Sequence, residues 1–559
     1  MTVPQGDADV KVSRPWLWIH LASLGVVLAV LVFVGRGQWF FGDDWDYVVF
    51  RGFAHPQHGL FSPHNEHWST LVVAYYRVIF NVFGLRTYWP YLLGVFAAHL
   101  VLVHGLWRLM LRARVDAALA TGVALVLGLY GAGYENVLWA VQISYLGSLA
   151  VGVWLLLLLH DEPRRARVAV VAVGNVVSLM FSGFSVVMVA VVGLAALRRW
   201  GWRKAVAITA PAAVIYLAWL KWQGDQGLTG SNAQFHGGPR DIPRYVWGGI
   251  SSALGAPLHQ PRLGELVLVA LLVVFVVRGW SWWQRSPELV ALAVGAPVMF
   301  AVISQGRGAI QSPSSPRYLY VAAVMVFPLL AYAVSPLVRG SAPRSWLALG
   351  VCVALAASGF GLLRDAARVE RDRELTLKGQ VLGAVQLADT QPVVTDTPDF
   401  AGQGDMTVEK LQGLRRRGQL PDFTPNPRDQ AYARLAMQIN VASQGDEALN
   451  GAPQTTAVLP AQAVSAAAAD GCSDVDLRGA DLVVGRKSGV GGVAAFVLVP
   501  SNAGVVQAYV PYPGGRAGPR TFPVAAGARA VVRNLVDRSI ELSLPAGVNH
   551  LCGIAWQTN

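Results

Sequence analysis

Long apolar runs separated by short polar segments fill the first two thirds of the chain. Nine of these runs approach the roughly 20 residues that a helix needs to cross a bilayer, and they cover residues 16–35, 88–107, 115–133, 143–159, 205–222, 263–279, 288–304, 317–336 and 345–363. Two shorter runs, 168–181 and 184–197, are separated at Ser182-Gly183. The pattern predicts an α-helical polytopic membrane protein with about eleven transmembrane helices.

The composition agrees with this prediction. Of the 559 residues, 54% are hydrophobic and only 14% are charged, whereas a soluble domain carries about 25% charged residues. The mean hydropathy is +0.42. Most of the chain therefore belongs in a bilayer.

Basic residues gather in alternate loops, which all face the cytoplasm if the N-terminus is cytoplasmic. They are Lys11, Arg14, Arg108, Arg112, Arg114, Arg164, Arg165, Arg167, Arg198, Arg199, Arg203, Lys204, Arg278, Arg285, Arg339 and Arg344. This agreement requires residues 69–84 to lie along the outer surface as an interfacial helix. The first run is a signal anchor, because no small-residue cleavage site follows it. We therefore expect a plasma (inner) membrane protein with a cytoplasmic N-terminus and an extracytoplasmic C-terminus. The net charge of +12 is then explained by these loops and does not indicate a nucleic-acid partner.

The sequence changes character after residue 363. Mixed charges over 364–385 predict an exposed helix, and 388–455 is rich in Pro, Gly, Asp and Gln, with a helical patch near 429–442. Short β-branched runs follow at 481–484, 493–499, 505–510, 530–535 and 540–544, as in an antiparallel sandwich. Cys472 and Cys552 bracket these runs, so we expect a disulfide, the alternative being two unpaired thiols. The expected domains are a cytoplasmic tail (1–15), a membrane body (16–363), a juxtamembrane helix with connector (364–455) and an exported β-rich domain (456–559).

Acidic and histidine side chains follow the first apolar run. Asp43-Asp44 lies directly after it, and His64-Asn-Glu-His67 comes shortly before the next apolar sequence. A further acid, Glu135, lies in the second outer loop. Charged side chains beside an otherwise apolar membrane body are a functional-site hypothesis. The sequence contains no P-loop and no Rossmann glycine motif, which excludes ATP-driven transport by this chain alone.

The layout of residues 16–340 resembles the GT-C superfamily of membrane glycosyltransferases. The resemblance is carried by Asp43-Asp44, by a surface segment ending in Phe83-Gly84, by the arginines of 108–114, by the broken pair of runs around Ser182-Gly183 and by Arg317-Tyr318-Leu319. In layout it is most similar to bacterial protein mannosyltransferases, aminoarabinose transferases and arabinofuranosyltransferases. It implies a sugar donor linked to a polyprenyl phosphate.

Transfer of such a sugar needs a base for the acceptor hydroxyl and cations for the departing phosphate. The resemblance favours Asp43 over Asp44 as this base; the alternative for the pair is a solvated helix cap. It also implies that Glu135 contacts the acceptor, unless this residue is an interfacial glutamate among anchoring aromatics. Arg307 and Arg317 are candidates for the phosphate, because arginine binds two oxygens at once; the alternative is interaction with lipid headgroups.

The remaining candidates leave several roles open. His64, Glu66 and His67 could bind a divalent cation, hydrogen-bond to acceptor or phosphate, or be structural, and their spacing matches no fixed metal geometry. We assign no metal ligands and no certain cofactor. Trp45 belongs to the interfacial aromatic belt and could also stack on a sugar.

The sequence thus predicts a membrane glycosyltransferase that moves a sugar, with inversion, from a polyprenyl-phosphate donor to an exported glycan, lipid or protein. The exported domain would bind carbohydrate or act as a scaffold. One alternative is a transporter or flippase for a lipid-linked precursor. Transporters usually bury charge at mid-membrane, however, and the predicted spans here are almost free of acids. A non-enzymatic assembly or sensor protein is the third alternative.

The expected orientation can be tested with fused reporters. A reporter placed after Arg364 should be exported, and one placed between Arg198 and Lys204 should be cytoplasmic, because the basic loops stay inside. Protease accessibility and reporter activity in intact cells measure both. A cytoplasmic C-terminus would contradict the orientation and the outer location of Asp43.

Overall fold

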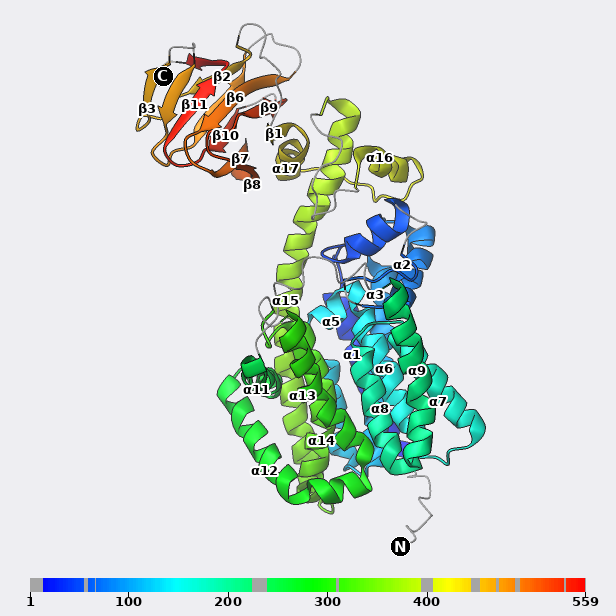
Figure 1. Ribbon diagram of the computed structural model, residues 1–559. Coiled ribbons are helices and arrows are strands. Elements are labelled where there is room, and N and C mark those ends of the chain that lie inside the picture. Colours follow the sequence, from blue (N-terminus) through cyan, green and yellow to red (C-terminus); the bar gives the residue numbers. More distant parts are fainter. Residues whose placement is uncertain are drawn as a thin grey trace. The chain divides into compact units, whose positions relative to one another are not determined.

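The computed structural model describes residues 14–54, 59–65, 67–223, 239–307, 311–393, 406–443, 453–468, 472–487, 493–536 and 539–557 (Figure 1). The chain divides into two compact units. The first comprises Met1–Gln38, Pro56–Val82 and Tyr88–Arg371. The second comprises Trp39–His55, Phe83–Thr87 and Asp372–Asn559.

Helices make up the first unit. They are α1 (Arg14–Val34), α2 (Thr70–Phe83), α3 (Trp89–Arg112), α4 (Ala117–Gly128), η2 (Gly131–Gly133), α5 (Glu135–Leu138), η3 (Ala140–Gln142), α6 (Ile143–Leu158), α7 (Arg165–Leu179), α8 (Ser185–Trp200), α9 (Trp202–Gln223), η5 (Pro239–Asp241), α11 (Ile242–Gly255), η6 (Ala256–Leu258), α12 (Pro261–Arg285), α13 (Pro287–Arg307), α14 (Pro316–Val338) and the first part of α15 (Ala342–Thr390).

Eight helical segments in the described residues are long and apolar enough to cross a membrane, namely α1, α3, η3 with α6, α9, α12, α13, α14 and α15. The three other expected spans coincide with the shorter helices α4, α7 and α8. Every expected run thus lies on a helix, and the break at Ser182-Gly183 separates α7 from α8. The chain is that of a multi-pass membrane protein.

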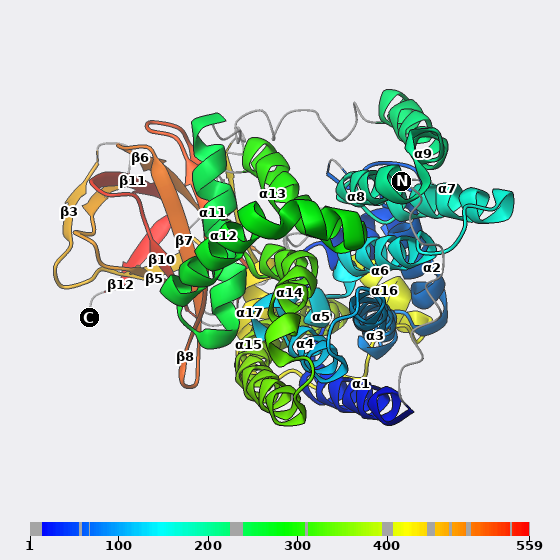
Figure 2. The same ribbon diagram turned by 90° about the horizontal axis from the view of Figure 1, so that it is seen from below.

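Helix α14 forms much of the core of this unit. It packs against α13, α11 and α4, and Figure 2 shows it between α13 and α4. Every side chain from Tyr318 to Leu329 is buried, as in a helix surrounded by other helices. Helix α12 is different, because apolar side chains such as Leu266, Val276 and Val277 are exposed on it. An exposed apolar surface on a spanning helix suits contact with lipid.

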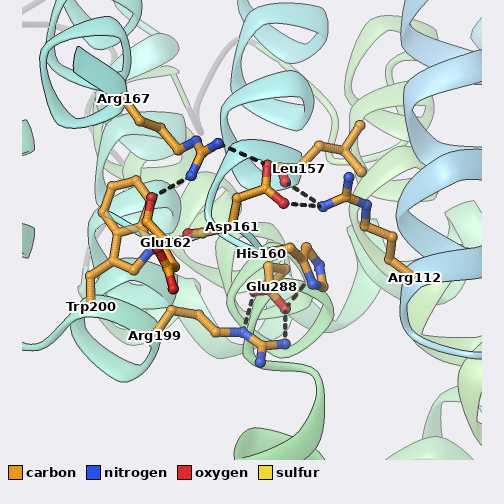
Figure 3. Close-up of polar contacts among 9 residues, drawn as sticks. All are labelled: Arg112, Leu157, His160, Asp161, Glu162, Arg167, Arg199, Trp200 and Glu288. Atoms are coloured by element: carbon orange, nitrogen blue, oxygen red, sulfur yellow. Dashed lines mark hydrogen bonds and ion pairs between the residues drawn. The ribbon is translucent and has the colours of Figure 1, made fainter. Parts of the chain in front are cut away.

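The loop between α6 and α7 collects charge at one end of the bundle (Figure 3). Asp161 forms ion pairs with Arg112 of α3 at 3.5 Å and with Arg167 of α7 at 3.4 Å. The indole N–H of Trp200 donates to the Asp161 carbonyl at 3.1 Å. Basic residues that we expected to share one side of the membrane therefore meet at one end of the bundle.

Glu288 forms the second half of this charged cluster. Its side chain is 1% exposed and accepts two hydrogen bonds from the Arg199 guanidinium, at 2.7 and 3.2 Å. His160 Nε2 lies 3.6 Å from the same carboxylate (Figure 3). The buried charge is thus paired, as burial of a charge requires.

The second unit contains a β-sandwich. Its elements are η1 (Asp46–Ala54), the end of α15, α16 (Val408–Arg416), α17 (Pro427–Met437), β1 (Ile439–Ser443), β2 (Thr455–Val458), β3 (Val464–Ala467), β4 (Ser473–Asp476), β5 (Leu482–Arg486), β6 (Ala494–Pro500), β7 (Gly504–Tyr512), β8 (Gly515–Val524), β9 (Ala530–Asn534), β10 (Ile540–Ser543), β11 (Val548–Cys552) and β12 (Ile554–Gln557). One sheet has the order β1-β9-β6-β11-β4-β3 and the other β12-β2-β5-β10-β7-β8. All pairs are antiparallel except β12 with β2.

The five expected strands correspond to β5, β6, β7, β9 and β10, and the expected Cys472–Cys552 disulfide is present. Such a link constrains the unfolded chain and is worth roughly 2–4 kcal/mol.

The packed unit also contains residues upstream of 456. Leu435 of α17 and Ile439 of β1 are buried in the same core as Phe496. The expected helical patch at 429–442 is therefore helix only as far as Met437 and strand afterwards.

Two short segments of the second unit, Trp39–His55 and Phe83–Thr87, are hydrogen-bonded to residues much later in the chain. Trp39 donates its backbone N–H to Glu374 Oε2 at 2.5 Å. Leu85 donates its backbone N–H to the Gln419 carbonyl at 2.7 Å. The loop after α1 and the turn after α2 are thus held by the C-terminal part of the chain. The helix expected over 364–385 is present as the continuation of α15, which is 49 residues long.

The His160 imidazole predicts a pH-dependent stability. Burial lowers the pKa of His160, and the neighbouring Glu288 carboxylate only partly opposes this effect. The folded protein therefore favours the neutral ring, so stability is full above the unfolded pKa of about 6.5 and declines as pH falls below it.

We expect the thermal unfolding midpoint to decrease as the pH is lowered from about 7.5 to about 5.5. The decrease should be smaller in His160→Gln. The exposed His259 supplies the control variant, His259→Gln, which should retain the wild-type slope. Equal slopes in wild type and His160→Gln would contradict the assignment.

Candidate functional site

A tight turn follows α1 and carries the first candidate residues. The N–H groups of Asp44 and Trp45 donate to the carbonyls of Phe41 and Gly42 at 3.1 and 3.2 Å. Gly42 has φ +52°, which glycine adopts without a steric penalty. The Asp44 side chain is 0% exposed, and its Oδ2 accepts the Phe41 N–H at 3.3 Å. Asp44 therefore stabilises the turn itself.

Asp43 differs from its neighbour in exposure. Its side chain is half-buried, and its carbonyl accepts the N–H groups of Asp46 and Tyr47 at 3.1 and 3.4 Å. These bonds lead into η1, a π-helix, a rare element that is frequent at functional sites. Of the two adjacent carboxylates, Asp43 is the more accessible to a substrate.

Asp46 has a partner inside η1. Its Oδ2 accepts the Nε–H of Arg51 at 2.8 Å, and the Arg51 side chain is 5% exposed. The guanidinium also lies 5.8 Å from the centroid of the Tyr47 ring. Asp46 thus orients the first turn of η1.

Trp45 is part of an aromatic cluster. Its ring is 0% exposed and lies 5.3 Å from the Trp39 ring and 5.8 Å from the Phe40 ring, between centroids. The sugar contact expected for Trp45 stays a prediction, although the ring is fully buried beside Trp39 and Phe40. Trp45 is a core residue of the loop.

Two candidates from distant parts of the sequence meet in the first unit. Arg317, the second residue of α14, lies with its Nε 3.3 Å from Glu135 Oε2, and the two side chains are 21% and 19% exposed. The guanidinium lies 5.6 Å from the Trp139 ring centroid and 5.9 Å from that of Tyr318. The arrangement is a half-buried cation with an aromatic wall and one carboxylate beside it.

Two glycines bring Glu135 to this position. A Cβ on Gly131 would lie 2.0 Å from the Gly359 carbonyl oxygen, and one on Gly133 would lie 2.5 Å from Tyr320 Cβ. Only residues without a side chain allow the segment before α5 to approach α14 and α15 so closely. The close approach places α5, which begins at Glu135, beside the start of α14.

The histidine segment forms a small hairpin in the first unit. His64 and His67 exchange two backbone hydrogen bonds, at 3.0 and 2.9 Å, and Asn65 has φ +50°. His64 is buried and His67 half-buried. Glu66 lies outside the described residues, so its role stays a prediction.

Within the described ranges, one group could hold a metal ion by its composition, formed by Cys472, His550 and Cys552. Its two sulfur atoms are bonded to each other. His64 and His67 do not belong to such a group among the residues with described positions. Arg307 ends α13, but its side chain lies outside the described part, and its phosphate role also stays a prediction.

Sequence reasoning missed Glu374. The residue is 0% exposed and accepts the Trp39 N–H. Its stretch of the sequence carries mixed charges, so an acid there is expected to be solvated. The neighbouring residues Arg373 and Leu375 are indeed exposed. Only its distant partner distinguishes it.

Comparison with known proteins finds similarity among solved structures only. No family model and no curated protein matches the chain. Among solved structures, the chain is similar to ArnT from Cupriavidus metallidurans bound to undecaprenyl phosphate, with 15% identity and a TM-score of 0.45. The similarity covers 77% of this chain and 93% of that one. It concerns the course of the chain only.

Proposed function

We propose that this protein is a GT-C-type membrane glycosyltransferase. It moves a sugar from a polyprenyl-phosphate-linked donor to a hydroxyl group of an exported cell-envelope glycan, lipid or protein. The two clusters have separate roles: the loop of Asp43 activates the acceptor, and Arg317, beside Glu135, binds the donor phosphate.

The contrast between Asp43 and Asp44 carries this proposal. A general base needs a carboxylate that a substrate can reach. Asp44 is fully buried and bound to its own turn, whereas Asp43 is half-buried. Asp43 would accept the acceptor proton while the acceptor oxygen attacks the anomeric carbon. The bond from that carbon to the phosphate oxygen breaks, and the phosphate leaves with the electron pair.

A single carboxylate acting as base fits a single displacement, which inverts the anomeric centre. A retaining transfer by two displacements would need a carboxylate that acts as nucleophile within about 5 Å of a second one. Asp44 and Asp46 lie near Asp43 in sequence but are engaged with Phe41 and Arg51. We therefore propose inversion.

Arg317 has the features of a phosphate ligand. A guanidinium binds two phosphate oxygens at once, and Arg317 is held at a helix start by the Trp139 and Tyr318 rings. Glu135 lies beside the same guanidinium. It would keep this cation oriented before the donor binds and contact the acceptor afterwards.

Transport of a lipid-linked precursor is the alternative. A transporter would bury charge near mid-membrane. Here Glu288 lies in the first turn of α13 and Glu265 is the fifth residue of α12. The acids of α15 begin at Asp365, after its apolar part. The accessible candidate carboxylates lie outside the spanning helices. This distribution favours the enzyme.

The decisive test is the substitution Asp43→Asn. It keeps the shape of the side chain but removes the proton acceptor, so transfer from a polyprenyl-phosphate sugar should slow by ~10²–10⁴. Donor binding should be unchanged. Radiolabelled donor turnover in proteoliposomes measures the rate.

Asp44→Asn is the matched neighbour. Its expected effect is on stability, since the buried hydrogen bond to Phe41 weakens by about 1–2 kcal/mol, with a much smaller loss of turnover than Asp43→Asn. A larger loss of turnover in Asp44→Asn would exchange the two roles. Near-normal transfer in both single variants and in the double variant would reject this loop as the catalytic centre.

Donor binding should depend on Arg317. Arg317→Gln should weaken binding of undecaprenyl phosphate about tenfold or more, because a charged hydrogen bond is worth roughly 1.5–3 kcal/mol. Glu135→Gln should not weaken it, since it removes an anion that competes with phosphate. The exposed Arg262 supplies the control variant, Arg262→Gln, which should bind as wild type. Equal affinity of Arg317→Gln and wild type in equilibrium titrations would reject the assignment.

A further inference from the structure

A cavity of about 580 Å³ lies in the second unit, beside the turn that carries Asp43. It is lined by Phe41, Gly42, Arg373, Glu374, Thr376, Leu377 and Gln380. The volume is within the range of small-molecule sites. Gly42 directly precedes Asp43, so one wall of the cavity is continuous with the proposed base.

The spacing along α15 explains how one wall is formed. Arg373, Thr376, Leu377 and Gln380 are separated by three, one and three residues, which places them on one face of a helix. The opposite wall is the turn at Phe41-Gly42. Trp39 and Glu374 tie this turn to α15 through their hydrogen bond of 2.5 Å. The two walls are thereby fixed to each other within one unit.

The chemistry of the lining indicates the class of ligand. Guanidinium, hydroxyl, amide and carboxylate groups alternate with two apolar side chains, Phe41 and Leu377. A sugar presents the complementary surface, with hydroxyl groups at its rim and C–H groups on its faces. Arg373 and Glu374 contribute one charge of each sign, which suits a neutral ligand. Two apolar side chains are too few for a polyprenyl tail.

We propose that this cavity binds a neutral carbohydrate unit of the acceptor, next to Asp43. The inference rests on the proposed function and specifies its acceptor class: a glycan rather than a lipid or a protein. Phe41 and Leu377 contact the C–H faces of the sugar, and Thr376 and Gln380 hydrogen-bond to its hydroxyl groups. The acceptor hydroxyl then lies at the edge that carries Asp43.

The test is saturation-transfer NMR on the full chain in lipid nanodiscs. The probes are the methyl glycosides of glucose, galactose, mannose, rhamnose, arabinofuranose and xylose. At least one should receive saturation from the wild-type protein. Leu377→Trp, which fills the cavity, should abolish this signal. The control is Leu375→Trp, the same change at an exposed position two residues away on α15, which should leave the signal intact.

A milder variant protects the test against misfolding. Gln380→Ala should weaken binding roughly fivefold, as expected for one lost hydrogen bond, with an unchanged thermal midpoint. In transfer assays it should raise the KM for the acceptor and leave kcat nearly unchanged. Asp43→Asn should bind the glycoside normally.

The outcomes separate this inference from the proposed function. If no glycoside binds, or if Leu377→Trp binds as wild type does, the cavity is not a sugar site. If transfer depends on Asp43 while Gln380→Ala has a normal acceptor KM, only the inference fails. If a glycoside binds in the cavity but no polyprenyl-phosphate sugar is ever consumed, the cavity assignment stands and the glycosyltransferase proposal fails.

Discussion

The exclusion of charge from hydrocarbon governs the whole architecture. A charged side chain in the bilayer is costly unless it is paired or reaches the interface. The chain meets this constraint by collecting charge at helix ends. Glu288 is almost fully buried, and it is paired with Arg199. Arg317 occupies the first turn of α14, where Glu135 is its partner. Charged groups can react only where they are paired or hydrated, which is at the ends of the spanning helices. The candidate residues lie at such positions.

The helices of the membrane body could be predicted from the sequence because each depends on a local run of apolar residues. A run of about 20 apolar residues identifies a spanning helix without knowledge of its neighbours, and all eleven expected runs lie on helices. The pairing of Glu135 with Arg317 could be anticipated only as two separate candidates, each at the end of an apolar run. Their separation of 182 residues leaves no pattern that would connect them.

The extramembrane part was less readable because its structure depends on distant partners. The apolar strand β6 was expected, whereas β4 (Ser473–Asp476) was not. β4 is a strand because it pairs with β11 and β3, and strand propensity depends strongly on such context. Trp45 and Glu374 illustrate the same limit. The sequence placed Trp45 in an interfacial aromatic belt and Glu374 in an exposed helix, and tertiary contacts bury both side chains.

The composite origin of the second unit has a consequence for how such proteins can diverge. The unit is assembled from three stretches of sequence, Trp39–His55, Phe83–Thr87 and Asp372–Asn559. Recombination that exchanged only the C-terminal stretch would separate Glu374 from Trp39 and Gln419 from Leu85. A chimera made at the end of the apolar segment would therefore inherit a mismatched turn around Asp43. Evolution of a new C-terminal domain must be accompanied by compensating changes in the two short segments near the N-terminus.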